Sequence, residues 1–442
     1  MKHVFLLFLA FLLGFTLPAQ DIELTFTGSG AATSVETVKV VYLSKGDTID
    51  INGADVLKLV SKLTGVCSPL PDGLSLLVYP NPVRDEGSIR FHSPQAGIVH
   101  LELYNHSGRM VTRSSHALQA GEHSFSISGL NQGIYTLRAC MPGHIVSLRI
   151  VSVEIKPGFP VLKHESSAIS SDATAVLKSR KAVVELLYTP GDYLLLKGVG
   201  GNHKRIVTIA PTESQVVNFE FIACADADGN HYPVVSIGTQ TWMAENLRTS
   251  RFNDNTEIEH VDSDIWWRFT GQPGYCWVNN DQDNFGYYGK LYNWYVGGGV
   301  KNPCPQGWHV PSHEEYMIFH NYLTDNGYAI GSDDSLDPDR YGFAGKAIAH
   351  IILWEPYPKT GTVGNNLLLN NITGLSLIPN GSRRADGESF SKTGEWCFLW
   401  LSTQLGDDLN AGWNVIVRND TPRHENHGSE KRRGAAIRCI KD

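Results

Sequence analysis

The N-terminal part of the chain alternates apolar and polar residues in the way that is typical of half-buried strands. Residues 22–27 (IELTFT) place Ile, Leu and Phe on one face of an extended segment and polar residues on the other. The alternation returns over residues 38–42, and Asn52-Gly53 supplies a turn. We therefore predict a small β unit over residues 20–74.

The following segments also carry strand patterns. Between residues 75 and 155, short apolar runs arrive roughly every 10–15 residues, and Ala120-Gly121 and Gln132-Gly133 are among the turns between them. This spacing predicts an antiparallel β-sandwich. Residues 156–175 hold Pro, Gly and a Ser cluster and predict a linker. Residues 176–223 then predict a short β segment.

The C-terminal half differs in kind, because all ten tryptophans lie there. Ser312 and Glu315 form a capping box just before apolar residues at helical spacing, which predicts a helix over residues 312–324. A second helix is predicted over residues 343–353. The rest consists of loops and short strands, so residues 224–442 are expected to form one α+β domain.

The first residues predict export. Lys2 precedes an apolar run over residues 4–17, which is shorter than the roughly 20 residues needed to span a bilayer. Small residues follow, so residues 1–19 are predicted to be a secretory signal peptide. No later apolar run is long enough to form a transmembrane segment. We expect a protein that is secreted or held at the cell surface.

Composition narrows the choice of partner. Hydrophobic residues make up 42% and charged residues 19% of the 442 residues, which is typical of folded domains. The net charge is −8, and the only dense basic run is Lys431-Arg432-Arg433, which a solvated loop explains. Nucleic acid is therefore excluded as the expected partner, because phosphate binding needs clustered cationic side chains.

Residues 77–153 resemble the C-terminal sorting domain of the type IX secretion system. The motifs that carry the resemblance are Tyr79-Pro80-Asn81-Pro82 after Val78, then Leu103-Tyr104-Asn105, Gly108-Arg109 and Gly133-Ile134-Tyr135. The resemblance implies a β-sandwich that directs cargo across the outer membrane. The family's domain normally ends its chain, whereas about 290 residues follow it here.

Residues 224–442 resemble the Fibrobacter succinogenes major paralogous domain. The matching segments are long and ordered: residues 237–247 (IGTQTWMAENL), 275–277 (YCW), 288–295 (YGKLYNWY), 304–312 (CPQGWHVPS) and 437–442 (IRCIKD). The resemblance implies an exported module and defines no biochemical activity.

The layout of this C-terminal domain also resembles the C-type-lectin-like fold. That resemblance implies that the final strand returns to the start of the domain and that Cys304 pairs with Cys439. Such a loop would stabilise the fold by roughly 4–5 kcal/mol. Cys276 would pair with Cys224 or Cys397, and the sequence does not choose between them. With seven cysteines in the chain, at least one stays free or pairs between molecules.

No sequence motif predicts an enzyme. The chain has no nucleophile elbow, zincin motif or P-loop. The sulfatase-modifying factors share the lectin-like fold and use a closely spaced cysteine pair, but Cys397 and Cys439 lie far apart. His309 could serve as a general base, although a half-buried structural histidine explains it as well. Glu314 and Glu315 are explained by their place in the first turn of a helix.

Metal binding is a weaker alternative at three places. Asp226, Asp228 and Asn230 alternate as the ligands of a calcium loop do. The glutamate ligand that such a loop needs further along the chain is absent, and a hairpin turn explains the three residues without it. His424 and His427, with Glu425 between them, are a weak transition-metal signal. The third place is an oxygen-rich cluster that consists of Asn279, Asn280, Asp281, Asp283 and Asn284. We predict no bound cofactor and leave calcium open as an alternative.

The aromatic residues are more suggestive of binding, because so many of them cannot all be buried easily. Exposed Trp and Tyr rings stack on sugars and form hot spots at protein interfaces. The predicted contact residues are Trp266, Trp267, Trp277, Asn279, Asn280 and Asp281. We therefore expect a non-catalytic exported protein that contacts a glycan or an extracellular protein. The rivals are a structural role in the cell envelope or fimbriae and an enzyme acting on polysaccharide.

Overall fold

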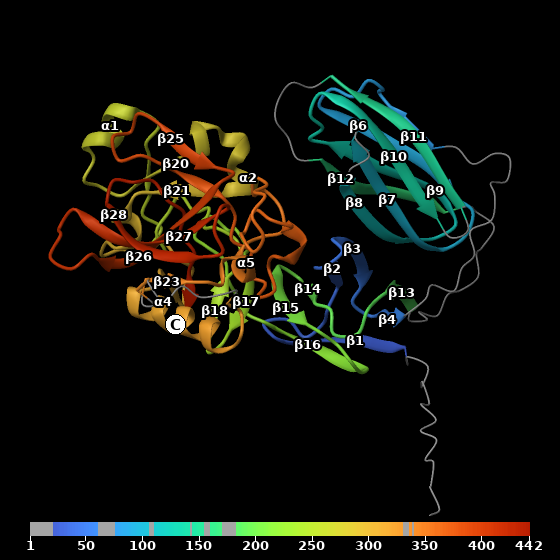
Figure 1. Cartoon of the computed structure of the whole chain (residues 1–442), viewed down its shortest axis with the longest axis horizontal. Coiled ribbons are helices and arrows are strands. Elements are labelled where there is room, and N and C mark those ends of the chain that lie inside the picture. The colour runs from blue at the N-terminus through green and yellow to red at the C-terminus, as the bar shows by residue number, and fades with distance from the viewer. Residues whose placement is uncertain are drawn as a thin grey trace, which may run out of the picture.

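A computed structural model describes residues 21–60, 76–105, 110–141, 144–153, 160–169, 183–329, 336–337 and 340–442. The predicted signal peptide, residues 1–19, and Cys67 lie outside the described residues. Figure 1 shows a blue and green N-terminal β domain, a teal β-sandwich beside it and a larger yellow-to-red C-terminal domain. Strands dominate the two smaller parts, as the alternating patterns predict.

The N-terminal domain takes its strands from two separate stretches of the chain. The first stretch supplies β1 (Ile22–Gly30), β2 (Thr37–Tyr42), β3 (Asp47–Asn52) and β4 (Val56–Val60). The second supplies β13 (Val183–Leu187), β14 (Leu194–Gly200), β15 (His203–Ile209) and β16 (Gln215–Phe221). Ile22, Leu24 and Phe26 are buried as the alternation of residues 22–27 predicts.

The two stretches form one folding unit, which corrects the prediction of separate units over residues 20–74 and 176–223. β1 pairs in parallel with β16, and β4 pairs in parallel with β13. One hydrophobic core contains Leu24 and Val40 from the first stretch and Leu196 and Phe219 from the second. Pairing between residues nearly 200 positions apart leaves no local signal in the sequence, so the two halves look independent.

The β-sandwich is inserted between these two halves. Its strands are β5 (Leu76–Tyr79), β6 (Glu86–Ser93), β7 (Gly97–Asn105), β8 (Met110–Leu118), β9 (Gly121–Ser128), β10 (Gly133–Met141), β11 (His144–Ser152) and β12 (Val161–Ile169). The strands pair with one another in an antiparallel manner, as predicted. The predicted linker, residues 156–175, is wrong over β12, because this strand pairs along the whole of β9 and buries Leu162.

Asn81 of the Tyr-Pro-Asn-Pro motif closes one side of the sandwich. Its side-chain amide donates to the Arg149 carbonyl at 2.9 Å and accepts from the Val151 amide at 2.9 Å. The Val83 amide adds a bond to the Val151 carbonyl at 2.8 Å. The peptide bonds before Pro80 and Pro82 are cis. The motif therefore covers the edge of β11 that would otherwise expose unpaired backbone groups.

A short seam joins the inserted sandwich to its host. β3 pairs in parallel with β8 at two positions, Ile49 with Ser115 and Asp50 with His116. The Arg113 guanidinium lies 2.5 Å from the Asp47 carboxylate and 3.6 Å from that of Glu102. These side chains are mostly buried, so the seam holds the inserted sandwich in direct contact with its host.

The C-terminal domain has many short elements. Its strands are β17 (Pro233–Ile237), β18 (Gln240–Met243), β19 (Glu259–His260), β20 (Gly274–Trp277), β21 (Lys290–Tyr292), β22 (Trp308–His309), β23 (Tyr341–Gly342), β24 (Asn380–Arg383), β25 (Phe390–Thr393), β26 (Trp396–Gln404), β27 (Ala411–Arg418), β28 (His424–Glu430) and β29 (Ile440–Lys441). Its α-helices are α1 (Asp264–Phe269), α2 (Phe285–Tyr288), α3 (Trp294–Gly297), α4 (His313–Asp325) and α5 (Gly345–Ile348). Within the residues that the structure describes, 3-10 turns cover Val278–Asn280, Gln282–Asn284 and Leu367–Leu369.

The helix predictions have mixed outcomes. α4 begins after Ser312, whose hydroxyl accepts from the Glu315 amide while the Glu315 carboxylate accepts from the Ser312 amide, so the predicted capping box is confirmed. The second predicted helix, residues 343–353, is wrong in length, because only α5 is helical. Ala349 leaves the helix in an extended conformation, and Leu353 has a φ of 75°.

The end of the chain returns to the start of the C-terminal domain. β29 lies between β18 and β22 and pairs with both. Cys304 and Cys439 form a disulfide, which confirms the predicted bond. The other predicted partners are wrong: Cys224, Cys276 and Cys397 are free, buried thiols in three different hydrophobic clusters. The C-type-lectin-like fold itself stays a prediction.

Buried cationic side chains hold the loops of this domain together. The Arg438 guanidinium donates to the Ser376 carbonyl at 2.7 Å, to the Leu375 carbonyl and to the Asn246 side-chain oxygen at 2.8 Å. The Lys346 ammonium donates to three backbone carbonyls between residues 362 and 366. Burial lowers the pKa of Lys346 to about 8 and that of Arg438 to about 10. Each cation supplies hydrogen bonds that loop carbonyls would otherwise lack.

The nested architecture predicts that the host folds without its insert. Residues 61–182 are replaced by a flexible linker of about twelve residues, the length that a parallel crossover needs. The variant should unfold cooperatively, because β1, β4, β13 and β16 still pair with one another. Thermal unfolding followed by circular dichroism measures this. A chain without β13–β16 is the contrast, and equal loss of cooperative unfolding in both variants would contradict the nested fold.

The disulfide predicts a large stability effect. The bond joins cysteines 135 residues apart, and both are buried. Changing Cys304 and Cys439 together to Ser should lower the free energy of unfolding by about 2–5 kcal/mol, because the unfolded chain regains its loop entropy. Denaturant unfolding checks this, with Cys140→Ser as the control for a thiol that is free. Equal unfolding midpoints for the two variants would show that the bond contributes nothing.

Candidate functional site

Helix α1 exposes large apolar side chains to solvent. Ile265, Trp266 and Phe269 are 72%, 73% and 73% exposed. At 3.6 residues per turn, these three positions fall within a sector of roughly 100° on the helix. Figure 1 shows α1 at the end of the C-terminal domain that lies away from the inserted sandwich. The helix therefore carries one continuous apolar face, which we call the α1 face.

The opposite side of α1 is anchored by Trp267, which is completely buried. The Arg383 guanidinium lies 4.6 Å from the centre of the Trp267 ring. The Ser263 hydroxyl caps the first turn of the helix by accepting from the Trp266 amide. Trp267 was predicted as a contact residue, and its burial removes it from that role. It holds the helix so that its neighbours point outward.

Arg383 fixes the segment that leads into the helix. It is fully buried and donates to the Val261 and Asp262 carbonyls at 2.7 and 2.8 Å. It also pairs with the Asp264 carboxylate at 2.8 Å. Bonds from a buried charged group are stronger than neutral ones. The α1 face therefore stands on a rigid base.

Three of the other predicted contact residues, Asn279, Asn280 and Asp281, lie on an exposed loop near the start of α1. The side-chain amide of Asn280 donates to the Asp262 carbonyl at 3.0 Å, which joins this loop to the residue before the cap of α1. Asp281 accepts from the Asp283 amide at 3.0 Å, and Asn279 is exposed with a φ of 58°. The structure thus brings Trp266 and Asn280 to neighbouring segments.

Trp277 is half-buried behind this loop. Its ring lies 4.1 Å from that of His260 and meets the Tyr275 ring edge-on at 5.9 Å. These contacts make it part of an aromatic cluster under the loop. Trp277 offers less surface to a ligand than Trp266 does.

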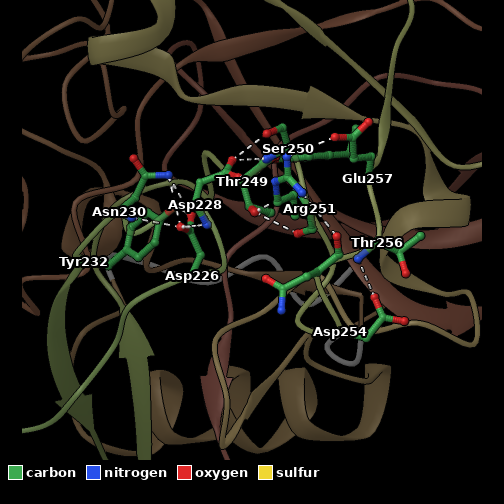
Figure 2. Close-up of polar contacts among 12 residues, drawn as sticks. Asp226, Asp228, Asn230, Tyr232, Thr249, Ser250, Arg251, Asp254, Thr256 and Glu257 are labelled. Atoms are coloured by element: carbon green, nitrogen blue, oxygen red, sulfur yellow. Dashed lines mark hydrogen bonds and ion pairs between the residues drawn. The ribbon is translucent and has the colours of Figure 1, made fainter.

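The alternating oxygen ligands proposed at residues 226–230 are engaged in holding a hairpin (Figure 2). Asp226 accepts from the Asp228 and Asn230 amides at 3.0 and 2.9 Å and from the Tyr232 hydroxyl. Asp228 accepts from the amide and hydroxyl of Ser250 at 2.5 and 2.6 Å. Both carboxylates are used by the loops themselves, and the hairpin alternative explains them.

Side chains that could bind a metal ion do not gather at one place in the described part of the chain. Within those residues, no group of three or more His, Cys, Asp or Glu side chains could hold a metal ion. The oxygen-rich residues 279–284 form hydrogen bonds among themselves and to neighbouring backbone. Calcium dependence stays an untested alternative for that loop.

Comparison with known protein families identifies two modules. Residues 235–441 match the Fibrobacter succinogenes major domain, and residues 77–151 match the secretion system C-terminal sorting domain. The chain carries both domains. It matches no curated protein and no solved structure at a significant level. Within the described residues, no helix is long and apolar enough to cross a membrane.

His309 of the Fibrobacter succinogenes major domain lies between two carboxylates. Its Nδ1 is 2.6 Å from Asp442 and its Nε2 is 2.8 Å from Glu315. Burial lowers the pKa of His309, but the hydrogen bonds to Asp442 and Glu315 outweigh it and raise that pKa above its usual value. Both ring nitrogens are engaged, so the geometry favours a link between the chain end and α4 over the general-base alternative.

The histidines of β28 do not converge on one point. His424 is fully buried and its Nδ1 lies 2.7 Å from the Tyr316 hydroxyl. Burial, together with the nearby His320, lowers the pKa of His424 to about 3. His427 instead lies 2.9 Å from Glu425, and its other nitrogen accepts from Arg340 at 2.7 Å. The transition-metal alternative therefore has no shared site at His424 and His427.

Sequence reasoning missed Ile265 and Phe269 as parts of the α1 face. The signal that could have found them is the segment Asp264–Phe269 (DIWWRF) itself. Its apolar residues lie all around a short helix, so one globular core cannot bury all of them. Propensity does not say which side faces inward, and the contact between Trp267 and Arg383 decides it.

The His309 link predicts a pH-dependent contribution to stability. The substitution His309→Gln removes the imidazole ring, whose pKa is raised in the folded protein. The stability difference from the wild type should be full near pH 5 to 5.5, about one unit below the usual histidine pKa of about 6.5, where histidine is protonated in both states. It should shrink as the pH rises through the raised pKa of the folded protein. Urea unfolding at several pH values measures it, and a difference that grows with pH would contradict the assignment.

Proposed function

We propose that this protein is displayed outside the cell, where it binds a glycan or protein ligand through the α1 face and catalyses no reaction. The sorting domain supports delivery to the cell surface, and the predicted signal peptide would begin that route. The exposure of Ile265, Trp266 and Phe269 on an anchored helix is the observation that carries the binding proposal.

Exposed apolar side chains of this size need a reason. Isolated ones are common on protein surfaces, but adjoining ones usually mark a place of contact. The base of α1 is rigid, so little conformational entropy is lost when a ligand covers the face. Asn280 and its loop lie beside the helix and can add polar contacts.

A structural role through strand addition finds less support. Joining subunits in that way needs an open strand edge. In the sorting domain, β8 already pairs with β3, and Asn81 and Val83 cover part of β11. These contacts leave short edges on that sheet. We place the contact on the C-terminal domain because the α1 face is exposed there.

The binding proposal predicts the effect of removing the α1 face. Trp266→Ala with Phe269→Ala should lower binding to a glycan array or to intact cells of the producing strain by at least about tenfold, because hot-spot aromatics carry most of the contact energy. Labelled full-length protein with and without calcium gives the measurement.

The control is Leu409→Ala, which removes an equally exposed apolar side chain, 73% exposed, on the turn between β26 and β27. It should bind like the wild type. Unfolding midpoints of both variants should match the wild type, since the changed side chains lie in solvent. Unaltered binding by the double variant on every surface would end the proposal.

A further inference from the structure

Three histidines occupy core-facing positions in the inserted sandwich. In the register of β7 with β8, His116 lies opposite Val99, which is buried in the core. In the register of β9 with β12, His164 lies opposite the buried Phe125, and His123 precedes Phe125 by two residues on the same face of β9. Titratable rings therefore stand where the alternation of the strands favours apolar side chains.

These three residues, His116, His123 and His164, form what we call the histidine cluster. The centre of the His164 ring lies 4.7 Å from that of Phe125, 5.7 Å from that of His116 and 6.3 Å from that of His123. The His116 ring also meets the Phe125 ring edge-on at 4.8 Å. The cluster thus connects β12 and β9 of one sheet to β8 of the other.

The surroundings of His116 oppose its protonation. Burial, followed by the neighbouring His164 and Lys39, lowers the pKa of His116 to about 4. Its Nε2 lies 2.5 Å from the Ser114 hydroxyl, so a neutral group is its hydrogen-bonding partner. Asp50 is beside His116 in the pairing of β3 with β8, but it is exposed and lies opposite Lys39 in the pairing of β2 with β3. A positive charge on His116 therefore finds little compensation in the closed sandwich.

The carboxylates on the neighbouring strands compensate little as well. Glu165 of β12 attracts His164, but it is exposed and lies 3.2 Å from the Lys163 ammonium. Glu122 of β9 is exposed and lies 3.0 Å from the His92 ring nitrogen of β6. Water screens such exposed charges, so they stabilise a buried imidazolium weakly.

Strand β12 is the part of the sandwich that can open at the lowest cost. It is the terminal strand of its sheet, whose order is β12-β9-β6-β5, and within this sheet it pairs with β9. The register shifts between His164 and Ser166, which interrupts that pairing. Among the β12 side chains whose burial the structure describes, Leu162 is the buried one. Local opening takes place where few buried contacts are lost.

We infer that β12 is an acid-released strand: protonation of the histidine cluster frees β12 from β9 while the rest of the sandwich stays folded. Release gives water access to His116 and His164, which then carry their charge at a lower cost. It also exposes the outer edge of β9, to which another strand can pair. The inference does not depend on the binding proposed for the α1 face.

The direction of the pH effect follows from the pKa of His116, which is lowered in the folded protein. The neutral ring stabilises the closed form fully above the usual histidine pKa of about 6.5. This stabilisation is lost as the pH falls from there towards the lowered pKa of about 4. Opening of β12 should therefore grow over this interval.

The test is hydrogen–deuterium exchange of the full-length protein at about pH 7.5, 6.5, 5.5 and 4.5, which brackets the histidine range. Mass spectrometry follows peptides of β9 and β12, with β10 and β11 as the reference, and each rate is corrected for the intrinsic pH dependence of exchange. The variants are His116→Gln with His164→Gln, and His116→Phe as a second variant that keeps an aromatic ring.

The matched control is His100→Gln. Burial also lowers the pKa of His100 to about 4. Its Nδ1 lies 2.6 Å from the Ser115 hydroxyl, and these two residues occupy the face of β7 and β8 that is opposite to the histidine cluster. The control therefore removes a buried histidine of the same sandwich without touching the cluster.

Protection of β9 and β12 should fall by roughly fiftyfold or more between about pH 7.5 and 4.5 in the wild type and in His100→Gln, since each pH unit between the two pKa values changes the equilibrium about tenfold. Protection of β10 and β11 should change little. The double glutamine variant should lose this response, and His116→Phe should reduce it by about tenfold.

Three results would overturn the inference. Constant protection of β12 in the wild type would show that the cluster releases nothing. Equal loss of protection in β10 and β11 would mean that acid unfolds the whole sandwich. An unchanged response in the double variant, or in His116→Phe if the double variant does not fold, would assign the pH effect to another group.

Discussion

The C-terminal domain depends on buried cations that bond to backbone carbonyls. Its strands and helices are short, so many carbonyls in its loops lack a partner within a sheet or helix. Arg383, Arg438 and Lys346 supply that missing hydrogen bonding from inside the domain. A guanidinium group can serve several carbonyls at once because its donors form a planar fork. Arg383 in particular joins the core to α1, which sets the orientation of the exposed face.

The sorting domain occupies an unusual place in this architecture. It is inserted into another β domain. The strands β1 and β16 of that domain come from the two sides of the insertion and pair with each other. The pairing of β3 with β8 and the contact between Arg113 and Asp47 hold it in register with its host. The host in turn continues into the C-terminal domain through the pairing of β15 with β17. Paired strands therefore run without a break from the sorting domain through its host into the C-terminal domain.

Much of the local structure could be predicted from residue patterns. The alternation at Ile22, Leu24 and Phe26 and the capping box of Ser312 depend on neighbours within a few residues. The link between Cys304 and Cys439 came from the resemblance of the domain's layout to a known fold, since cysteine spacing alone allows many pairings. The linker prediction at residues 156–175 failed because β12 is stabilised by the distant β9, and composition carries no record of such pairing.

For the candidate site, the sequence by itself determined only that two adjacent tryptophans, Trp266 and Trp267, lie in a domain rich in aromatic residues. It could not distinguish Trp266 from Trp267, because two adjacent tryptophans have the same intrinsic preferences. Only the tertiary structure decided which ring is buried. Arg383 arrives from a strand more than 110 residues later and packs against Trp267, and this contact turns Ile265, Trp266 and Phe269 toward solvent. Local patterns depend on neighbouring residues in the sequence. The exposure of a side chain depends on residues, distant in the sequence, that pack against it in the fold.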